Sequence, residues 1–139
     1  MSKTKAADTF PTLAELAAAE YDRTHSTPWH ERYTVASSTN LWLRYVLSYD
    51  VAERLWSCNG EWCGRAKWCK HRQLAAVLKE AIWWERQLAD CAPAELRALL
   101  PTKRQQVRLD VDALSAHGCL LAIDALLAAA GESAGEVAA

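Results

Sequence analysis

The feature that most constrains this chain is a dense cluster of cysteine and histidine residues. Cys58, Cys63, Cys69 and His71 fall within fourteen residues, directly before the most regular helical pattern in the sequence. Thiolate sulfur and neutral imidazole nitrogen both suit Zn²⁺, and four protein ligands leave no open position for a reacting water. The cluster therefore predicts a structural zinc site, not a catalytic one.

The sequence around the cluster also fits a known arrangement. Cys69-Lys70-His71 runs straight into a helical segment at 72–78, and two β-rich segments precede it at 33–39 and 42–47. This order resembles the SWIM zinc finger family, whose members carry C-x-C and C-x-H ligand pairs on a ββα unit. The resemblance covers roughly residues 32–82 and implies that a structural zinc ion holds a hairpin against a helix.

The first ligand pair departs from that family pattern. Four residues separate Cys58 from Cys63, where the family has one. If either thiol is not a ligand, His30 or Cys91 could take the fourth position. A cysteine can also be merely a small buried apolar side chain, and that alternative stays open for each thiol.

Length, composition and cysteine number bound the architecture and the compartment. With 139 residues, 51% of them apolar, the chain predicts one domain over residues 9–131 between disordered tails at 1–8 and 132–139. No apolar run reaches the length of about twenty residues that spans a membrane, and the N-terminus lacks the apolar core of a signal peptide. We expect a cytoplasmic protein of a prokaryote or virus, where five thiols favour metal binding over disulfides.

Periodicity predicts an α+β fold. A capping box at 12–15 would begin a helix that runs to about Arg23. Alternating apolar residues over 33–49 predict a β-hairpin that turns at 37–40. The helix after His71 is the clearest, since its apolar residues recur on one face. A β-hairpin and a zinc-bound helix should thus lie between flanking N-terminal and C-terminal helices.

The C-terminal third is expected to be mainly helical. Pro101 should close a short helix over 94–100, because a proline inside a helix removes a hydrogen bond and clashes with the preceding turn. Alternation at 107–111 favours a short strand, although the same residues could instead open the last helix, which should begin at an N-cap at Asp112 and run to Ala130. Gly118 inside that last helix suggests a close crossing against another helix.

Nucleic-acid binding is the favoured function. The net charge is only −1, so attraction to nucleic acid would need a local basic patch. The sequence around the cysteines could form such a patch. It contains one acidic residue, Glu61, and four basic residues, Arg65, Lys67, Lys70 and Arg72. A loaded Cys3His site adds about −1, so the segment keeps a charge of roughly +2. We therefore expect a zinc-binding accessory or regulatory protein that binds nucleic acid, most readily DNA, through these four residues.

The alternative function is that of a protein–protein interaction adaptor. Seven tryptophans in 139 residues is several times average usage, and tryptophan is strongly enriched in interface hot spots. Trp83 and Trp84 are adjacent on the predicted helix, about 100° apart, so both cannot face one core. One of them should stay partly exposed and available to a partner. The resemblance permits either function, because the SWIM family is associated with both DNA binding and protein contacts.

Enzymatic activity is not expected. Phosphate-binding, dinucleotide-binding, nucleophile-elbow and zinc-protease motifs do not occur in the sequence. A nucleophile dyad of Cys69 and His71 is conceivable, since a thiolate beside an imidazole is activated. Two further thiols nearby make metal binding the better interpretation.

Overall fold

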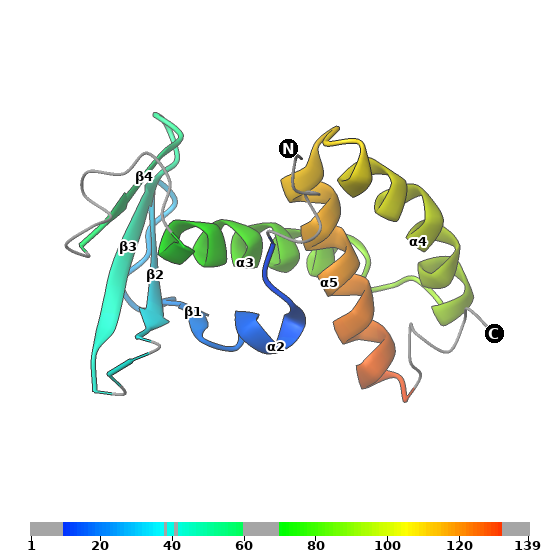
Figure 1. The fold of residues 1–139 in the computed structure, drawn as a ribbon, viewed down its shortest axis with the longest axis horizontal. Coiled ribbons are helices and arrows are strands. Elements are labelled where there is room, and N and C mark those ends of the chain that lie inside the picture. Colours follow the sequence, from blue (N-terminus) through cyan, green and yellow to red (C-terminus); the bar gives the residue numbers. More distant parts are fainter. Residues whose placement is uncertain (1–9, 38, 41, 60–69, 132–139) are drawn as a thin grey trace. The chain divides into compact units, whose positions relative to one another are not determined.

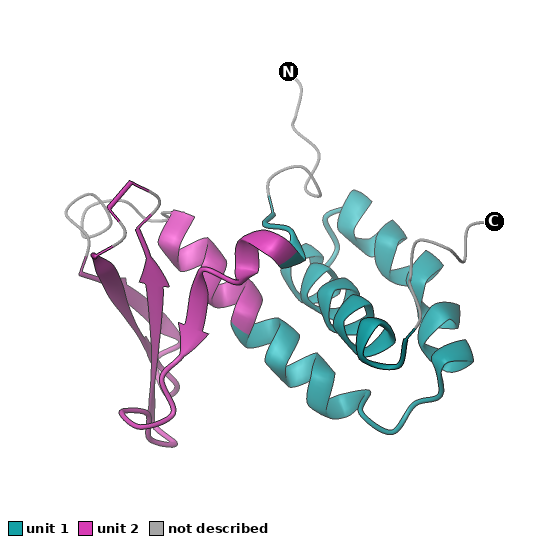
Figure 2. Ribbon diagram, turned by 90° about the horizontal axis from the view of Figure 1, so that it is seen from below, with its two compact units in different colours: residues 1–13, 79–139 teal, residues 14–78 magenta. Residues whose placement is uncertain are grey.

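The computed structural model describes residues 10–37, 39–40, 42–59 and 70–131, which form an α+β fold (Figure 1). The chain divides into two compact units, one of residues 14–78 and one of residues 1–13 with 79–139 (Figure 2). We call them the sheet unit and the helical unit. The predicted α+β class is confirmed, whereas the tails predicted at 1–8 and 132–139 lie outside the described residues.

The sheet unit contains one antiparallel sheet of four strands in the order β1-β2-β3-β4. The strands are β1 (Ala19–Tyr21), β2 (His30–Ala36), β3 (Arg44–Asp50) and β4 (Leu55–Cys58). The predicted hairpin is confirmed as β2 and β3, in which Tyr33 pairs with Leu47. Its connection is organised by Ser37, whose buried Oγ accepts a hydrogen bond from the Asn40 N–H at 3.0 Å.

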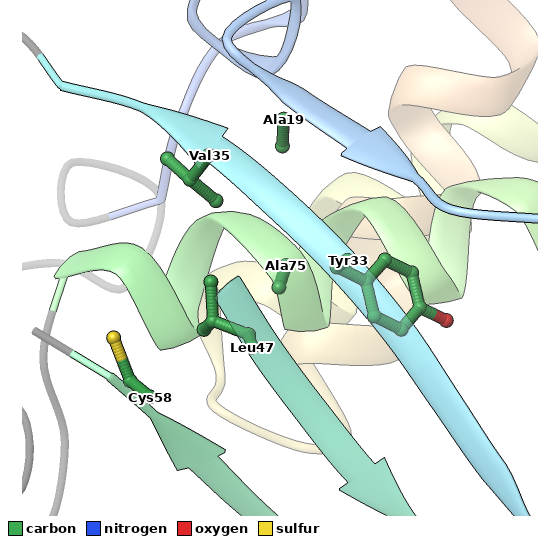
Figure 3. Close-up of a cluster of buried hydrophobic side chains, with 6 residues drawn as sticks. All are labelled: Ala19, Tyr33, Val35, Leu47, Cys58 and Ala75. Atoms are coloured by element: carbon green, nitrogen blue, oxygen red, sulfur yellow. The ribbon is translucent and has the colours of Figure 1, made fainter. Parts of the chain in front are cut away.

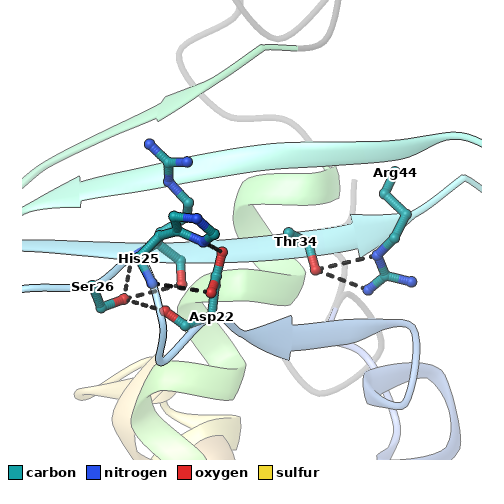
Figure 4. Close-up of polar contacts among 6 residues, drawn as sticks. Asp22, His25, Ser26, Thr34 and Arg44 are labelled. Atoms are coloured by element: carbon teal, nitrogen blue, oxygen red, sulfur yellow. Dashed lines mark hydrogen bonds and ion pairs between the residues drawn. The ribbon is translucent and has the colours of Figure 1, made fainter.

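The two faces of this sheet differ sharply. Because side chains alternate along each strand, paired residues such as Tyr33, Leu47 and Cys58 lie on one face, which we call the core face (Figure 3). Ala75 of α3 (Lys70–Gln87) is buried in the same cluster. The opposite face is polar: the Arg44 Nη2 donates to the Thr34 Oγ1 at 2.9 Å (Figure 4).

The predicted N-terminal helix is wrong over most of its length. The helix α2 covers only Leu13–Leu16, and β1 follows three residues later. Ala19 pairs with Val35 and Tyr21 with Tyr33, which places both on the core face of the sheet. Burial on that face outweighs helix propensity, which is only a weak prior over an alanine-rich segment with a thin apolar stripe.

The helical unit contains the second half of α3 together with α4 (Pro93–Arg108) and α5 (Ala113–Ala129). Its core holds Leu88, Leu96, Leu100, Cys119, Ile123 and Leu127. The predicted close crossing at Gly118 is confirmed: a Cβ there would collide with the Glu80 Cβ and lie 3.0 Å from the Glu80 carbonyl carbon. None of the described helices is both long and apolar enough to cross a membrane.

Two predictions for the C-terminal third are wrong. Pro101 does not end a helix, since α4 continues to Arg108, and the strand predicted at 107–111 is absent from the described residues. Val107 is buried near the end of α4, while Leu109 and Val111 are exposed in the turn before α5. Of the three alternating apolar residues, only Val107 is therefore part of the core, and the other two lie on the surface.

Candidate metal centre

Two of the four predicted zinc ligands lie side by side in the sheet unit. Cys58 ends β4 and His71 is the second residue of α3. The Cys58 Sγ lies 3.9 Å from the His71 Nδ1. Zinc bonds of about 2.3 Å to sulfur and 2.0–2.1 Å to nitrogen, at a tetrahedral angle, would place the two ligand atoms about 3.6 Å apart. The observed separation is therefore close to that of two ligands sharing one ion.

The sheet and the helix each fix one of these side chains. Cys58 pairs with Leu47 of β3, so its thiol points to the core face and is buried. Asn59 secures the strand end, since its Oδ1 accepts from the Val46 N–H at 2.9 Å. The His71 ring packs against Tyr45, with ring centroids 4.1 Å apart. The strand-to-helix junction therefore orients a thiol and an imidazole toward one point.

The electrostatic environment favours the metal-binding form of His71. Burial lowers the pKa of its imidazole, and the positive charge of Lys70 lowers the pKa further. The ring is therefore mainly neutral at neutral pH, which is the form that binds a metal ion.

The remaining predicted site residues are only partly described. Cys63, Cys69, Arg65 and Lys67 lie outside the described residues, and the described part of the chain holds no group of three or more His, Cys, Asp or Glu side chains that could hold a metal ion. Lys70 is exposed at the start of α3, and Arg72 is half-buried two residues later. No acidic residue occupies the first turn of α3.

Of the two substitute ligands, His30 lies in the same unit as this junction and does not join it. His30 begins β2 on the polar face, where its Nε2 lies 3.4 Å from the Asp50 Oδ2. Asp50 is three residues from Leu47, the partner of Cys58, and so lies on the opposite face and about 10 Å along β3. This geometry rules out His30 as a ligand beside Cys58. Cys91 packs against the core of the helical unit.

A second polar cluster was missed by sequence reasoning. The Asp22 Oδ2 lies 2.8 Å from the His25 Nδ1, and Ser26 follows directly, which superficially suggests a catalytic triad (Figure 4). However, the Ser26 Oγ donates to the Asp22 carbonyl oxygen at 2.7 Å and accepts from the Arg32 N–H at 2.8 Å. Its proton is therefore committed to the backbone, and the cluster is a capped turn, not a nucleophile.

The two predicted partner-binding tryptophans have different environments in the helical unit. Trp84 is half-buried; its Nε1 donates to the Ser115 Oγ at 3.1 Å, and the Lys103 Nζ lies 4.6 Å from its ring centroid. Trp83 packs edge-on against Trp84 and is 50% exposed. It lines an open hollow of about 250 Å³ with Lys79, Glu80 and Ser115.

Comparisons with protein-family models, with characterised proteins and with solved structures give no match for this chain. The resemblance to SWIM zinc fingers therefore remains a prediction from the residues themselves.

Proposed function

We propose that the strand-to-helix junction is a structural zinc site and that the protein binds nucleic acid beside it. The observation that supports the metal is the separation of 3.9 Å between the Cys58 Sγ and the His71 Nδ1. Cys63 and Cys69, which lie in the chain between these two residues, supply the other ligands. Four protein ligands saturate the ion, so its role is to hold β4 to α3 and not to activate water.

The charge around this junction favours nucleic acid as the ligand. Lys70 is exposed at the first residue of α3, where the helix dipole places partial positive charge, and the first turn holds no acid that would offset it. Arg65, Lys67 and Arg72 are close to it in the sequence, and together these four basic side chains are the proposed contacts to the phosphate backbone. The function is that of a non-enzymatic accessory or regulatory protein.

Nucleic-acid binding is tested by fluorescence anisotropy with a short labelled DNA duplex. We expect affinity to fall steeply between about 50 and 200 mM salt, because bound phosphates release counterions. Lys67→Glu and Lys70→Glu should each weaken binding severalfold. Arg54→Glu is the matched control, since Arg54 is exposed in the turn at the far end of β4. Equal affinities for all three variants would contradict the proposed basic surface.

A specific observation favours protein binding as the second candidate function. Trp83 is half-exposed beside an open hollow, and it packs against Trp84, which is itself fixed by the bond to Ser115. A partner side chain could pack on the Trp83 ring there. This function predicts association with a protein that persists at high salt and is lost in Trp83→Ala. Trp42→Ala, which removes a tryptophan that is 96% exposed in the sheet unit, is the control.

A further inference from the structure

The continuity of α4 brings three arginines onto one flank of the helical unit. The helix runs through Pro101 without a break (Figure 1), so Arg97, Arg104 and Arg108 keep helical register with one another. At about 100° per residue, these three positions fall within an arc of about 40°. A helix that ended at Pro101 would not align Arg97 with the other two.

This arginine flank is separate from the face of α4 that packs in the core. Leu96, Leu100 and Val107 are buried about a quarter-turn away. Lys103 lies beyond that buried face, toward Trp84, and is not part of the flank. The acidic residue of α4 is Glu95, whose Oε1 accepts from the Ala92 N–H at 2.7 Å at the N-terminus. Among the residues of α4, the flank therefore carries no acidic side chain.

Stabilisation of the helix dipole accounts for only part of this pattern. Cations in the last turn of a helix stabilise it through the helix dipole, which explains Arg108. It does not explain why the two exposed arginines, Arg104 and Arg108, align with Arg97, which lies three turns before Arg108 and is half-buried. Arg104 and Arg108 are both exposed, and neither has a carboxylate within 4.0 Å among the described residues.

We propose that the arginine flank of α4 binds the phosphate backbone of the nucleic acid, as a second contact surface in addition to the zinc junction. This proposal rests on the proposed function, and its residues belong to the helical unit, whereas the zinc junction belongs to the sheet unit. Arg97 and Arg108 are eleven residues apart, which is about 16 Å along the helix. Each strand of a DNA duplex carries about five phosphates over the same length. Arginine forms bidentate hydrogen bonds with phosphate and retains its charge at every physiological pH.

An anionic membrane is a poorer occupant of this surface. A helix that lies on a membrane must expose an apolar face to the lipid. The apolar face of α4 is instead occupied by the core, through Leu96, Leu100 and Val107. The exposed surface of α4 therefore lacks the apolar face that membrane binding requires, and its arginines suit a phosphate backbone.

The test compares the full-length chain with Arg104→Gln/Arg108→Gln by anisotropy over a series of salt concentrations. We expect the double variant to bind a DNA duplex about tenfold more weakly at low salt. The slope of log affinity against log salt should be shallower by about 2, one unit per lost phosphate contact. Arg104→Lys/Arg108→Lys should keep most of the slope, because lysine still neutralises phosphate.

The control removes the same two charges elsewhere. Arg54→Gln/Arg86→Gln changes one exposed arginine in each unit, and Arg86 occupies the last turn of α3 as Arg108 does in α4. Thermal melting of every variant is measured as well, so that a loss of binding caused by unfolding can be recognised. If the wild-type chain binds DNA and Arg104→Gln/Arg108→Gln retains its affinity and slope, the inference is overturned while the proposed function stands. If the wild-type chain shows no salt-dependent binding, both are overturned.

Discussion

A single missing side chain decides how closely α3 and α5 approach each other. A Cβ on Gly118 would lie 3.1 Å from the Ala81 backbone nitrogen and collide with the Glu80 Cβ. Alanine is the better helix former by about 1 kcal/mol, so Gly118→Ala would stabilise an open position. Here we expect it to destabilise the helical unit by about 1–3 kcal/mol, which lowers the melting temperature by roughly 3–10 °C.

The comparison for that variant is Gly131→Ala. Gly131 has a φ of 82°, and nothing lies within 4 Å of the position that a Cβ would take, so its cost of about 1 kcal/mol reflects backbone conformation only. A Gly118→Ala protein that melts higher than the wild type would show that the two helices can separate without penalty.

His117 gives the helical unit a sensitivity to acid. Its Nε2 donates to the Pro11 carbonyl oxygen at 2.7 Å, and its ring stacks on Phe10. Burial lowers the pKa of this imidazole, although the hydrogen bond to Pro11 partly opposes the shift. The unfolded chain therefore binds a proton near pH 6.5 that the folded chain does not, and stability falls as the pH drops below that value.

We expect the melting temperature of the wild type to decrease between about pH 7.5 and 5.5 more steeply than that of His117→Gln. The difference should stay below the limit of about 1.4 kcal/mol per pH unit that one proton allows. Other titrating groups contribute equally to both proteins and cancel. Identical pH profiles would show that His117 does not control this dependence.

At the scale of elements, the two prolines of α4 make opposite contributions. Pro93 is the first residue of the helix, where no intrahelical N–H bond is lost, whereas Pro101 lies inside it. Pro101→Ala should stabilise the protein by about 1–2 kcal/mol, since the regained hydrogen bond outweighs the added freedom of the unfolded chain. Pro93→Ala should destabilise it by less than about 1 kcal/mol. Midpoints of urea denaturation provide the measurement, and a loss of stability in Pro101→Ala would contradict it.

The elements that could be predicted are those long enough for their apolar pattern to repeat several times. The hairpin of β2 and β3 and the helix α3 each repeat their pattern over seven or more residues. By contrast, β1 and β4 are three and four residues long, and the pairing of β1 depends on a partner that is distant in sequence. Pro101 was misread because a local rule against proline gave way to the packing of Leu100 and Val107.

The candidate site was predictable to a similar extent. Nearness in sequence was enough to propose that Cys58 and His71 share an ion. The exclusion of His30 required the register of the sheet, because the register sets how far along the strand, and on which face, each side chain lies. The Asp22, His25 and Ser26 turn shows the reverse case, in which suggestive residues meet but the hydroxyl proton is bound to the backbone.

At the scale of the whole molecule, the sheet unit is the part that most needs additional support. Its fully buried cluster contains two alanines and one cysteine among six residues, and its larger apolar side chains, such as Tyr45 and Trp56, are only partly buried. A metal ion that joins β4 to α3 would contribute its binding free energy directly to folding. The helical unit has its own leucine-rich core.

The zinc content of the purified, untagged protein is the most direct test of the proposed metal centre. Elemental mass spectrometry should find one zinc ion per chain, and both Cys58→Ser and His71→Ala should lower that content. Treatment with a strong chelator should lower the melting temperature and abolish the cooperative melting of the sheet unit. A metal-free protein with unchanged melting would contradict the proposal, and the thiol and imidazole 3.9 Å apart would then be an ordinary contact of the core.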